Sequence, residues 1–170
     1  MLSILEEAPD FKAAGLRGRG EPVEARLREA RGRWVVLFFY PRDFTPVCPT
    51  EVRELSKRRA ELGAEVYALS VDDVETHRRW IAEVLGEVAF PLLADPGGAI
   101  ARAYGVLLPG EGVAARATFV IDPQGTIQHA AAQNLDVGRS ISELVRVVEA
   151  LRTGHAVPAG WQPGQPTLGR

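Results

Sequence analysis

The sequence predicts an α/β fold with a central mixed sheet flanked by helices, and three observations support this prediction. A continuous run of apolar, β-branched and aromatic residues at 34–40 is typical of a strand that is buried on both faces. Strand-like and helix-like stretches then alternate along the chain, which is typical of βαβ units with parallel strands. Two later strand-like runs flank the turn sequence 122–125, which indicates an antiparallel pair.

The composition is that of an ordinary globular protein. The chain has 170 residues, of which 46% are hydrophobic and 25% charged, enough to bury a core without disulfides or metals. Its formal net charge of -2 provides no basic field for a phosphate backbone or an anionic lipid surface. The sequence also shows neither a membrane-spanning apolar stretch nor the pattern of a signal peptide. We therefore expect a cytoplasmic protein with no nucleic-acid and no membrane partner.

The first βα unit is expected between residues 34 and 62. The strand at 34–40 leads through a proline-containing loop to a helix at 49–62. One face of this helix is apolar and a glycine stop signal follows it, as shown by Val52, Leu55, Leu62 and Gly63.

The second βα unit follows directly. A strand at 65–71 precedes a helix at 73–85, which carries apolar residues at helical spacing. We expect Asp72 and Glu75 to form the capping box of this helix. A further short helix is expected within 95–104.

The C-terminal part of the domain is expected to contain a hairpin and a last helix. The hairpin strands lie at 117–121 and 126–130. The last helix begins at Ser140, and Glu143 completes its capping pattern. Its apolar stripe should pack on the sheet and consists of Ile141, Leu144, Val145, Val148 and Leu151.

Residues 1–152 are therefore expected to form one domain, followed by a tail at 153–170. Prolines and glycines recur in the tail and prevent regular secondary structure over much of it. Trp161 is the one large apolar anchor of the tail, and we expect it to dock on a neighbouring surface such as that of a partner subunit.

Cys48 is the only cysteine of the chain. A single cysteine excludes an intramolecular disulfide, a Cys-x-x-Cys redox pair and a multi-thiolate metal site. The histidines give little support for a zinc site, because none is spaced i, i+4 with another. We expect no metal and no cofactor.

The predicted position of Cys48 favours chemistry. It follows a buried strand and precedes a helix, and the carboxyl ends of strands carry ligands and catalysis in α/β sheets. With Pro49 as the first helical residue, Cys48 lies near the N-cap, where free N–H groups and the helix dipole favour a thiolate. A lone cysteine is more often a buried apolar filler, and on position alone the two interpretations are about equal.

The residues around Cys48 identify a family. Pro41, Thr45 and Cys48 reproduce the Pro-x-x-x-Thr-x-x-Cys motif of the peroxiredoxins. The whole run 34–51 resembles the alkyl hydroperoxide reductase C-type, or typical two-cysteine, branch. The likeness extends over most of the chain and includes the segments 8–11, 70–72, 76–77, 80–81, 90–91, 94–95, 119–122, 137–140 and 158–161. This resemblance implies a thioredoxin-like fold with peroxiredoxin additions and a thiol-dependent peroxidase that reduces hydrogen peroxide and organic hydroperoxides.

The resemblance also implies a role for each site residue. Cys48 would be the peroxidatic nucleophile, and Arg116 would hold both its thiolate and the peroxide. Thr45 would place a hydroxyl near the same peroxide, and Pro41 would shield the sulfur from bulk water. Glu51 would orient the arginine through a charge-assisted hydrogen bond.

Each of these residues has a plainer interpretation when taken alone. Thr45 and Pro41 are common turn residues, Glu51 suits the first turn of any helix, and Arg116 could be a surface residue. Their occurrence together and in the order of the family favours one site.

Three further residues match the family with less chemistry attached. Arg139 matches an arginine near the active site, and it is equally consistent with an exposed residue before a helix. His77 shows no catalytic logic of its own. Trp80 is more typical of core or interface packing than of a substrate contact.

The tail departs from the family. The two-cysteine members carry a resolving cysteine immediately before the Pro-Ala-Gly-Trp segment, and here Val157 stands in that place. A Cys48 sulfenic acid would then need an external thiol, either a thioredoxin-like protein or a low-molecular-weight thiol, in a one-cysteine cycle. The family resemblance further implies a homodimer or a ring of dimers.

Two other functions compete with this hypothesis. A non-catalytic structural or chaperone-like oligomer on the same fold would not need the intact site residues. A cysteine hydrolase would need a general base beside the thiol, and no histidine lies in a recognisable position for that work.

Overall fold

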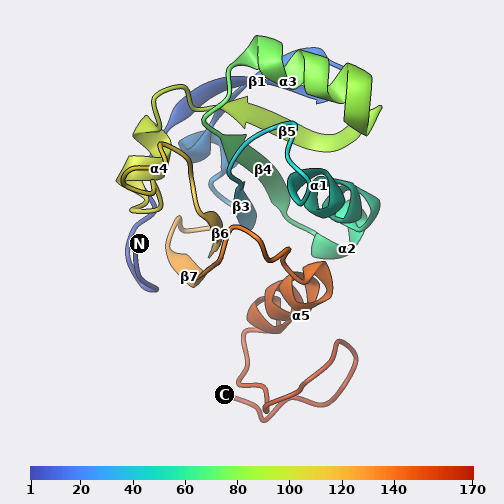
Figure 1. Ribbon diagram of the computed structural model, residues 1–170. Coiled ribbons are helices and arrows are strands. Elements are labelled where there is room, and N and C mark those ends of the chain that lie inside the picture. Colours follow the sequence, from blue (N-terminus) through green and yellow to red (C-terminus); the bar gives the residue numbers. More distant parts are fainter.

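The computed structural model describes residues 1–170 and contains one seven-stranded sheet with helices on both faces (Figure 1). The strands are β1 Lys12–Gly18, β2 Glu21–Arg26, β3 Val35–Phe39, β4 Glu65–Ser70, β5 Val88–Ala94, β6 Arg116–Ile121 and β7 Ile127–Gln133. The α-helices are α1 Cys48–Lys57, α2 Arg59–Leu62, α3 Val74–Trp80, α4 Ala99–Ala103 and α5 Ile141–Arg152. A 3-10 helix at Leu27–Ala30 and a π-helix at Ile81–Leu85 complete the regular structure. No helix has the length and apolar character needed to cross a membrane.

The sheet is mixed and has the strand order β2-β1-β5-β4-β3-β6-β7. β3 pairs in parallel with β4 and antiparallel with β6. Every residue of β3 is buried, which is what its continuous apolar run predicts. The predicted fold class is confirmed.

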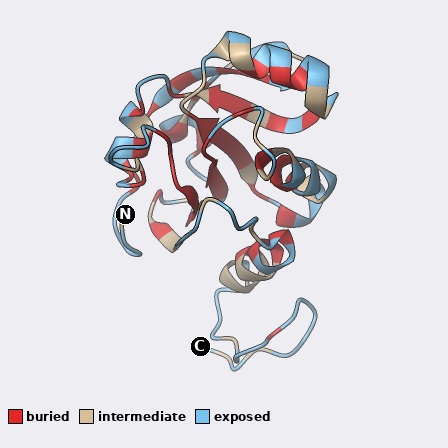
Figure 2. Cartoon of the chain, in the orientation of Figure 1, coloured by how far each residue is buried: buried red, intermediate tan, exposed pale blue.

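Alternate residues of β3 belong to two hydrophobic clusters, one on each face of the sheet. Phe38 packs in the cluster that includes residues of α1, α3 and α5, whereas Phe39 packs with residues of α4 and the N-terminal segment. Figure 2 shows the buried strands between these layers and the exposed outer faces of the helices. β3 is therefore packed on both faces, and the loop that follows it begins from a rigid strand.

The predicted hairpin and the predicted start of the last helix are confirmed. β6 and β7 pair antiparallel across the predicted turn. The Ser140 hydroxyl accepts a hydrogen bond from the Glu143 N–H at 3.2 Å and caps α5. The Glu143 carboxylate binds Arg146 at 2.7 Å instead of returning to Ser140, so only half of the capping box forms.

The helix predicted at 49–62 is broken into two. α1 begins one residue earlier, at Cys48, and the helical path is interrupted at Arg58 before α2. Gly63 ends α2 with a φ of 55°, the left-handed conformation that glycine adopts without strain. The predicted stop signal is thereby confirmed.

The capping box predicted from Asp72 and Glu75 is wrong. Asp73 is the N-cap of α3, and its carboxylate accepts the Thr76 N–H at 2.8 Å. Asp72 turns toward the Cys48 loop instead, where its carboxylate accepts the Asp43 N–H at 2.8 Å. The last part of the predicted helix is the π-helix at Ile81–Leu85.

Three strands, β1, β2 and β5, were not predicted. β1 pairs antiparallel with both β2 and β5, and β5 pairs in parallel with β4, so together they extend the sheet beyond β4. The short helix predicted within 95–104 is shorter than expected, because α4 covers only Ala99–Ala103. Asp95 precedes it, and its carboxylate accepts the N–H groups of Ile100 and Ala101 at 3.0 and 2.8 Å.

The tail after α5 contains no helix or strand, only one isolated bridge between Ala156 and Gly169. It projects away from the sheet below α5 (Figure 1). Trp161 is only 3% exposed, and its indole N–H donates to the Gln165 carbonyl at 3.0 Å. Arg146 of α5 donates to the Trp161 carbonyl at 3.3 Å. Trp161 therefore packs within its own chain, beside α5, and docking of the tail on a partner subunit stays a prediction.

Candidate active site

Cys48 lies at the start of α1 and beyond the carboxyl end of β3, as the sequence predicts. Residues 40–47 join the two elements, and Pro49 is the second residue of the helix. Cys48 is 0% exposed and carries the only thiol of the chain. The positive end of the helix dipole favours negative charge near this position.

Arg116, the first residue of β6, provides a cation beside the sulfur. The antiparallel register of β3 and β6 brings Arg116 to the carboxyl end of β3. Its Nη1 donates to the Cys48 Sγ at 3.3 Å and to Glu51 Oε2 at 2.8 Å. Its Nε donates to the Leu135 carbonyl at 2.6 Å, and the residue is 3% exposed. A buried guanidinium in this position stabilises a thiolate and can donate to an oxygen bound next to the sulfur.

Glu51 links two arginines beneath Cys48. It lies one helical turn after Cys48 and is 3% exposed. Its carboxylate accepts the backbone N–H, Nε and Nη2 of Arg139 at 2.8, 2.9 and 2.9 Å, in addition to the bond from Arg116. Burial opposes ionisation of Glu51, but the hydrogen bonds and charge of Arg139, aided by Arg116, hold its pKa below the ordinary value. The carboxylate is therefore charged at neutral pH.

Arg139 belongs to the site and is not an exposed residue. Its guanidinium carbon lies 3.3 Å from the centre of the Phe38 ring, and its Nη1 donates to the Ala117 carbonyl and to Thr118 Oγ1 at 3.0 and 3.1 Å. The side chain is 8% exposed. Arg139 thus joins the segment before α5 to α1 and β6.

Pro41 and Thr45 lie in the loop that leads to Cys48. Pro41 is buried at the beginning of this loop. Thr45 is half-buried, and its hydroxyl donates to the Arg42 carbonyl at 3.0 Å, which stabilises the loop itself. Cys48, Glu51, Arg116 and Arg139 are in direct contact, and these two loop residues complete the set without a hydrogen bond to it.

A second buried network, which the sequence did not reveal, anchors the same loop. The Tyr40 hydroxyl donates to Asp43 Oδ1 at 2.8 Å, and His77 Nδ1 lies 2.7 Å from Asp43 Oδ2. His77 Nε2 lies 3.2 Å from the Leu93 carbonyl, and Asp72 binds the Asp43 N–H from the other side. His77 was noted in the sequence without a role, and its partner lies 34 residues away in the chain.

Charge explains why this pair holds together. Burial alone would lower the pKa of His77, but the hydrogen bond and negative charge of Asp43 outweigh it and raise the pKa of His77 above the ordinary value. Trp80 stacks on Tyr40 with ring centres 5.6 Å apart and is 0% exposed. The expected packing role of Trp80 is confirmed.

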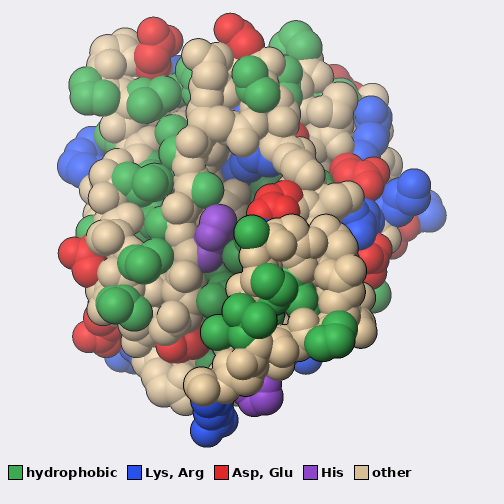
Figure 3. Space-filling model, turned by 90° about the horizontal axis from the view of Figure 1, so that it is seen from below, with side chains coloured by type: hydrophobic (Ala, Val, Ile, Leu, Met, Phe, Trp, Pro, Cys, Tyr) green, Lys and Arg blue, Asp and Glu red, His purple; other side chains and the backbone are tan.

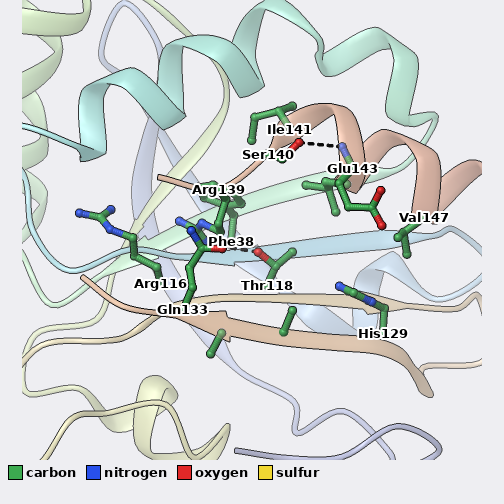
Figure 4. Close-up of a pocket in the computed structure, with 13 residues that line it drawn as sticks. Phe38, Arg116, Thr118, His129, Gln133, Arg139, Ser140, Ile141, Glu143 and Val147 are labelled. Atoms are coloured by element: carbon green, nitrogen blue, oxygen red, sulfur yellow. Dashed lines mark hydrogen bonds between the residues drawn. The ribbon is translucent and has the colours of Figure 1, made fainter. Parts of the chain in front are cut away.

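A cavity of about 160 Å³ lies on the other side of Arg139, between β6, β7 and the start of α5 (Figure 4). Its lining includes Phe38, Thr118, His129 and Ile141. In Figure 4 the Arg116 guanidinium points away from the other lining residues. Burial lowers the pKa of His129. Figure 3, a view from below, shows a recess in which histidine, basic and acidic side chains lie close together.

No cluster of three or more histidine, cysteine or acidic side chains in the structure could hold a metal ion. The chemistry that the Cys48 site can perform is that of a sulfur nucleophile beside a fixed, buried cation. Such a pair suits nucleophilic attack on a small substrate whose leaving atom takes negative charge.

Comparison with known proteins shows the family. A family model described as the AhpC/TSA family matches residues 4–130. Peroxiredoxin-2 of Macaca fascicularis is 43% identical over 177 residues, covering 97% of this chain and 89% of that protein. A Bacillus subtilis protein named as a peroxiredoxin, YkuU, is 42% identical over 173 residues, and the match covers 96% of this chain and 96% of that protein. The reduced 2-Cys peroxiredoxin of Plasmodium vivax has a similar structure, with a TM-score of 0.93, 34% identity and coverage of 98% of this chain and 93% of that chain.

These similarities agree with the geometry. The structural match extends over nearly the whole chain and confirms the thioredoxin-like fold expected from the sequence. The single cysteine sets this chain apart from the proteins whose names describe them as 2-Cys peroxiredoxins. The chain belongs to the AhpC/TSA family and is a peroxiredoxin, a thiol-dependent peroxidase.

Proposed function

We propose that this peroxiredoxin reduces hydrogen peroxide and organic hydroperoxides in a one-cysteine cycle. The observation that carries the proposal is the 3.3 Å contact between Arg116 Nη1 and the sulfur of the chain's only cysteine, Cys48. The thiolate attacks one peroxide oxygen, the O–O bond breaks, and the leaving oxygen takes the electron pair and a proton. The products are a Cys48 sulfenic acid and water, or an alcohol when the substrate is organic.

The surrounding residues are assigned roles that lower this barrier. Arg116 donates to the peroxide as negative charge develops on the leaving oxygen, and Glu51 and Arg139 hold the guanidinium in place. The Thr45 hydroxyl donates its proton to the loop, so its lone pairs are free to accept the peroxide O–H. Pro41 helps to exclude water from the sulfur. These assignments match the family pattern residue by residue.

The second half of the cycle needs a thiol from outside the chain. The resolving position carries Val157, and no other cysteine exists. A first external thiol condenses with the sulfenic acid, which releases water and forms a mixed disulfide with Cys48. A second thiol then attacks the mixed disulfide, restores the Cys48 thiol and forms a disulfide with the first thiol. We propose a thioredoxin-like protein or a low-molecular-weight thiol as the donor.

The burial of Cys48 sets a requirement on this step. The residue is 0% exposed, so the sulfur can meet an external thiol only after the first turn of α1 opens. The start of this turn has no side-chain cap, because Val47 at the N-cap makes no capping bond. Local opening of this turn is therefore part of the proposed cycle.

The proposal also covers assembly and place of action. We propose that residues 1–152 act as the folded catalytic domain, since α5 ends at Arg152, and that 153–170 act as a tail. Following the family resemblance, the chain forms a homodimer or a ring of dimers and works in the cytoplasm. Analytical ultracentrifugation of the reduced protein tests the assembly, and a monomer at micromolar concentration would contradict it.

The deciding experiment measures the peroxide that the pre-reduced protein consumes, with and without dithiothreitol. We expect rapid loss of about one equivalent of hydrogen peroxide per chain, with further turnover only when the thiol is present. Cys48→Ser is the matched control and should consume none. Wild-type consumption no greater than that of Cys48→Ser, with both hydrogen peroxide and an organic hydroperoxide, would refute the proposal. Turnover without any added thiol would refute the one-cysteine cycle.

A further inference from the structure

The strands β4 and β5 separate at the end of the sheet opposite the active site. β4 pairs with β3 along its length, from Glu65 to Leu69, but it pairs with β5 only from Ala68 onward. Pro91 in β5 has no N–H to donate, and the β1–β5 register shifts in the same region. β4 and β5 are therefore not paired with each other at their N-terminal ends. A cavity of about 340 Å³ lies there, called the seam cavity below.

Four arginines contribute to the wall of the seam cavity. Arg17, Arg26, Arg33 and Arg59 come from four separate segments of the chain and all line it. Arg33 is neutralised by Glu65 at 2.8 Å. The other three form no ion pair and no side-chain hydrogen bond in the structure. Unpaired cations gathered around one cavity make a site for an anion.

Arg26 adds a second observation. Its Nε is buried and has no hydrogen-bond partner within the chain. Buried charged donors almost always have a partner, because leaving one unsatisfied costs more than an ordinary hydrogen bond contributes. The unpartnered Nε of a residue that lines the cavity therefore points to a ligand that supplies the missing acceptor.

The acidic residues of the seam cavity do not cancel this charge. Glu24 pairs with Lys12 at 3.1 Å, and Glu65 pairs with Arg33. Glu29 is the one remaining carboxylate in the lining, and its side chain has no ion-pair partner. Three arginines without an ion pair and one carboxylate without an ion pair thus line the cavity, and this carboxylate can accept a hydrogen bond from a ligand hydroxyl.

The volume and the lining residues of the seam cavity indicate which class of ligand it can bind. The cavity, at about 340 Å³, is about ten times the volume that one water occupies in the liquid, so it holds more than an inorganic anion. Val23, Tyr67 and Phe90 give the cavity an apolar part on which an organic group can lie. Arginine forks match the oxygens of a phosphate group.

We propose that the seam cavity binds a small, hydroxyl-bearing organic phosphate. Arg17, Arg26 and Arg59 hold the phosphate, and Glu29 accepts a ligand hydroxyl. The site shares no residue with the Cys48 site and is independent of the peroxidase proposal.

Isothermal titration calorimetry on the reduced, full-length protein tests this site with adenosine 5′-monophosphate and ribose 5-phosphate as probes, and with adenosine as the phosphate-free comparison. We expect at least one phosphate probe to bind at submillimolar concentration and adenosine not to bind. Arg26→Gln and Arg59→Gln should each weaken that binding by roughly tenfold or more, because each removes a charge-assisted hydrogen bond.

Arg102→Gln is the matched control. Arg102 is an exposed arginine of α4 that forms no ion pair and lies outside the seam cavity, so its loss should leave binding unchanged. Undiminished peroxidase activity shows that Arg26→Gln and Arg59→Gln are folded. The proposal is overturned if neither phosphate probe binds, if adenosine binds equally well, or if Arg102→Gln weakens binding as much as the cavity variants.

Discussion

At the scale of single residues, the chemistry of this protein depends on what Arg116 and Glu51 do to each other. The guanidinium has two acceptors on one nitrogen, the Cys48 sulfur at 3.3 Å and the Glu51 carboxylate at 2.8 Å. The carboxylate keeps the arginine fixed, and the arginine keeps the carboxylate ionised. Neither residue could be replaced without changing the field at the sulfur.

Replacing Arg116 tests the first half of this relation. In Arg116→Gln the donor to the leaving oxygen loses its charge, and we expect the second-order rate constant with hydrogen peroxide to fall by roughly 10²–10³. Arg116→Lys keeps the charge but loses the planar fork, so its rate should lie between the two. Stopped-flow fluorescence at fixed pH measures these rates. A rate for Arg116→Gln within a factor of about three of the wild type would contradict the role.

Replacing Glu51 tests the second half through acid stability. Because the folded pKa of Glu51 lies below its ordinary 4.5, ionised Glu51 stabilises the fold above that pH. This contribution is lost as the pH falls from 4.5 through the lower folded pKa. The difference in unfolding free energy between wild type and Glu51→Gln should therefore shrink between pH 6 and pH 3, as measured by urea titration.

Glu54→Gln supplies the control, since Glu54 is an exposed acid on the same helix. At neutral pH the loss of the buried counter-charge in Glu51→Gln should cost about 3–5 kcal/mol. A pH-independent difference for Glu51→Gln, equal to that of Glu54→Gln, would show that the carboxylate is not held ionised by the arginines.

At the scale of elements, the loop from β3 to α1 is held from beneath by α3. The bond between His77 of α3 and Asp43 fixes the middle of this loop, and Tyr40 fixes its beginning through the same carboxylate. The loop carries Pro41, Thr45 and Cys48, so the geometry of the site depends on a contact that lies outside it.

His77→Gln tests this anchor. The pKa of His77 is raised above the ordinary 6.5, so the contribution of His77 to stability is complete below pH 6.5 and is lost as the pH rises through the folded pKa. The unfolding free energy of the wild type, relative to His77→Gln, should decrease as the pH rises above 6.5. Chemical denaturation from pH 6 to pH 9 measures this, with His155→Gln, an exposed histidine, as control. An increase with pH would contradict the anchor.

The elements also show what the sequence could predict. The buried strand β3, the hairpin of β6 and β7, and the cap of α5 at Ser140 follow from local patterns, and the structure confirms them. β1 and β5 could not be found this way, because their conformation depends on each other. Any side chain at Gly15 of β1 would clash with the Leu92 carbonyl of β5, at a distance of 2.1 Å. Glycine has a low strand propensity, but the close approach of β5 requires it at this position.

The candidate site divides in the same manner. Cys48, Pro41, Thr45, Glu51 and Arg116 could be named because they form a motif with fixed order. The sequence left Arg139 undecided, since only tertiary packing distinguishes a buried arginine from an exposed one before a helix. It gave no sign of the pairing between Asp43 and His77, because nothing local joins residues that lie 34 positions apart.

At the scale of the whole molecule, the proposed one-cysteine cycle follows from the sequence of the tail. By the family resemblance, Val157 of the tail stands at the position of the resolving cysteine, and the tail extends from α5 away from the sheet (Figure 1). The proposed dimer would bring this segment to another subunit. In the proposed cycle, the tail is the part of the chain at which a one-cysteine and a two-cysteine mechanism can be exchanged.

Val157→Cys tests this exchange. In an assembled dimer, one equivalent of hydrogen peroxide should convert Val157→Cys into a disulfide-linked species of twice the chain mass on non-reducing gels, while the wild type stays at the monomer mass. Mass spectrometry after excess peroxide should show sulfinic acid at Cys48 in the wild type and less of it in Val157→Cys. A crosslink that also forms in Cys48→Ser/Val157→Cys would show that the new cysteine reacts without Cys48.

The residues of the site that contact one another lie far apart in the sequence, and this separation affects when the site forms during synthesis and folding. Cys48 contacts Arg116, 68 residues later in the chain, and Glu51 contacts Arg139, 88 residues later. A ribosome synthesises the cysteine well before either arginine, and such distant contacts form late in folding. A nascent chain thus carries an ordinary thiol that reacts slowly with peroxide. The thiol becomes an efficient scavenger only when β6 and the segment before α5 have joined the sheet, so the unfinished chain is spared oxidation at the residue on which its function depends.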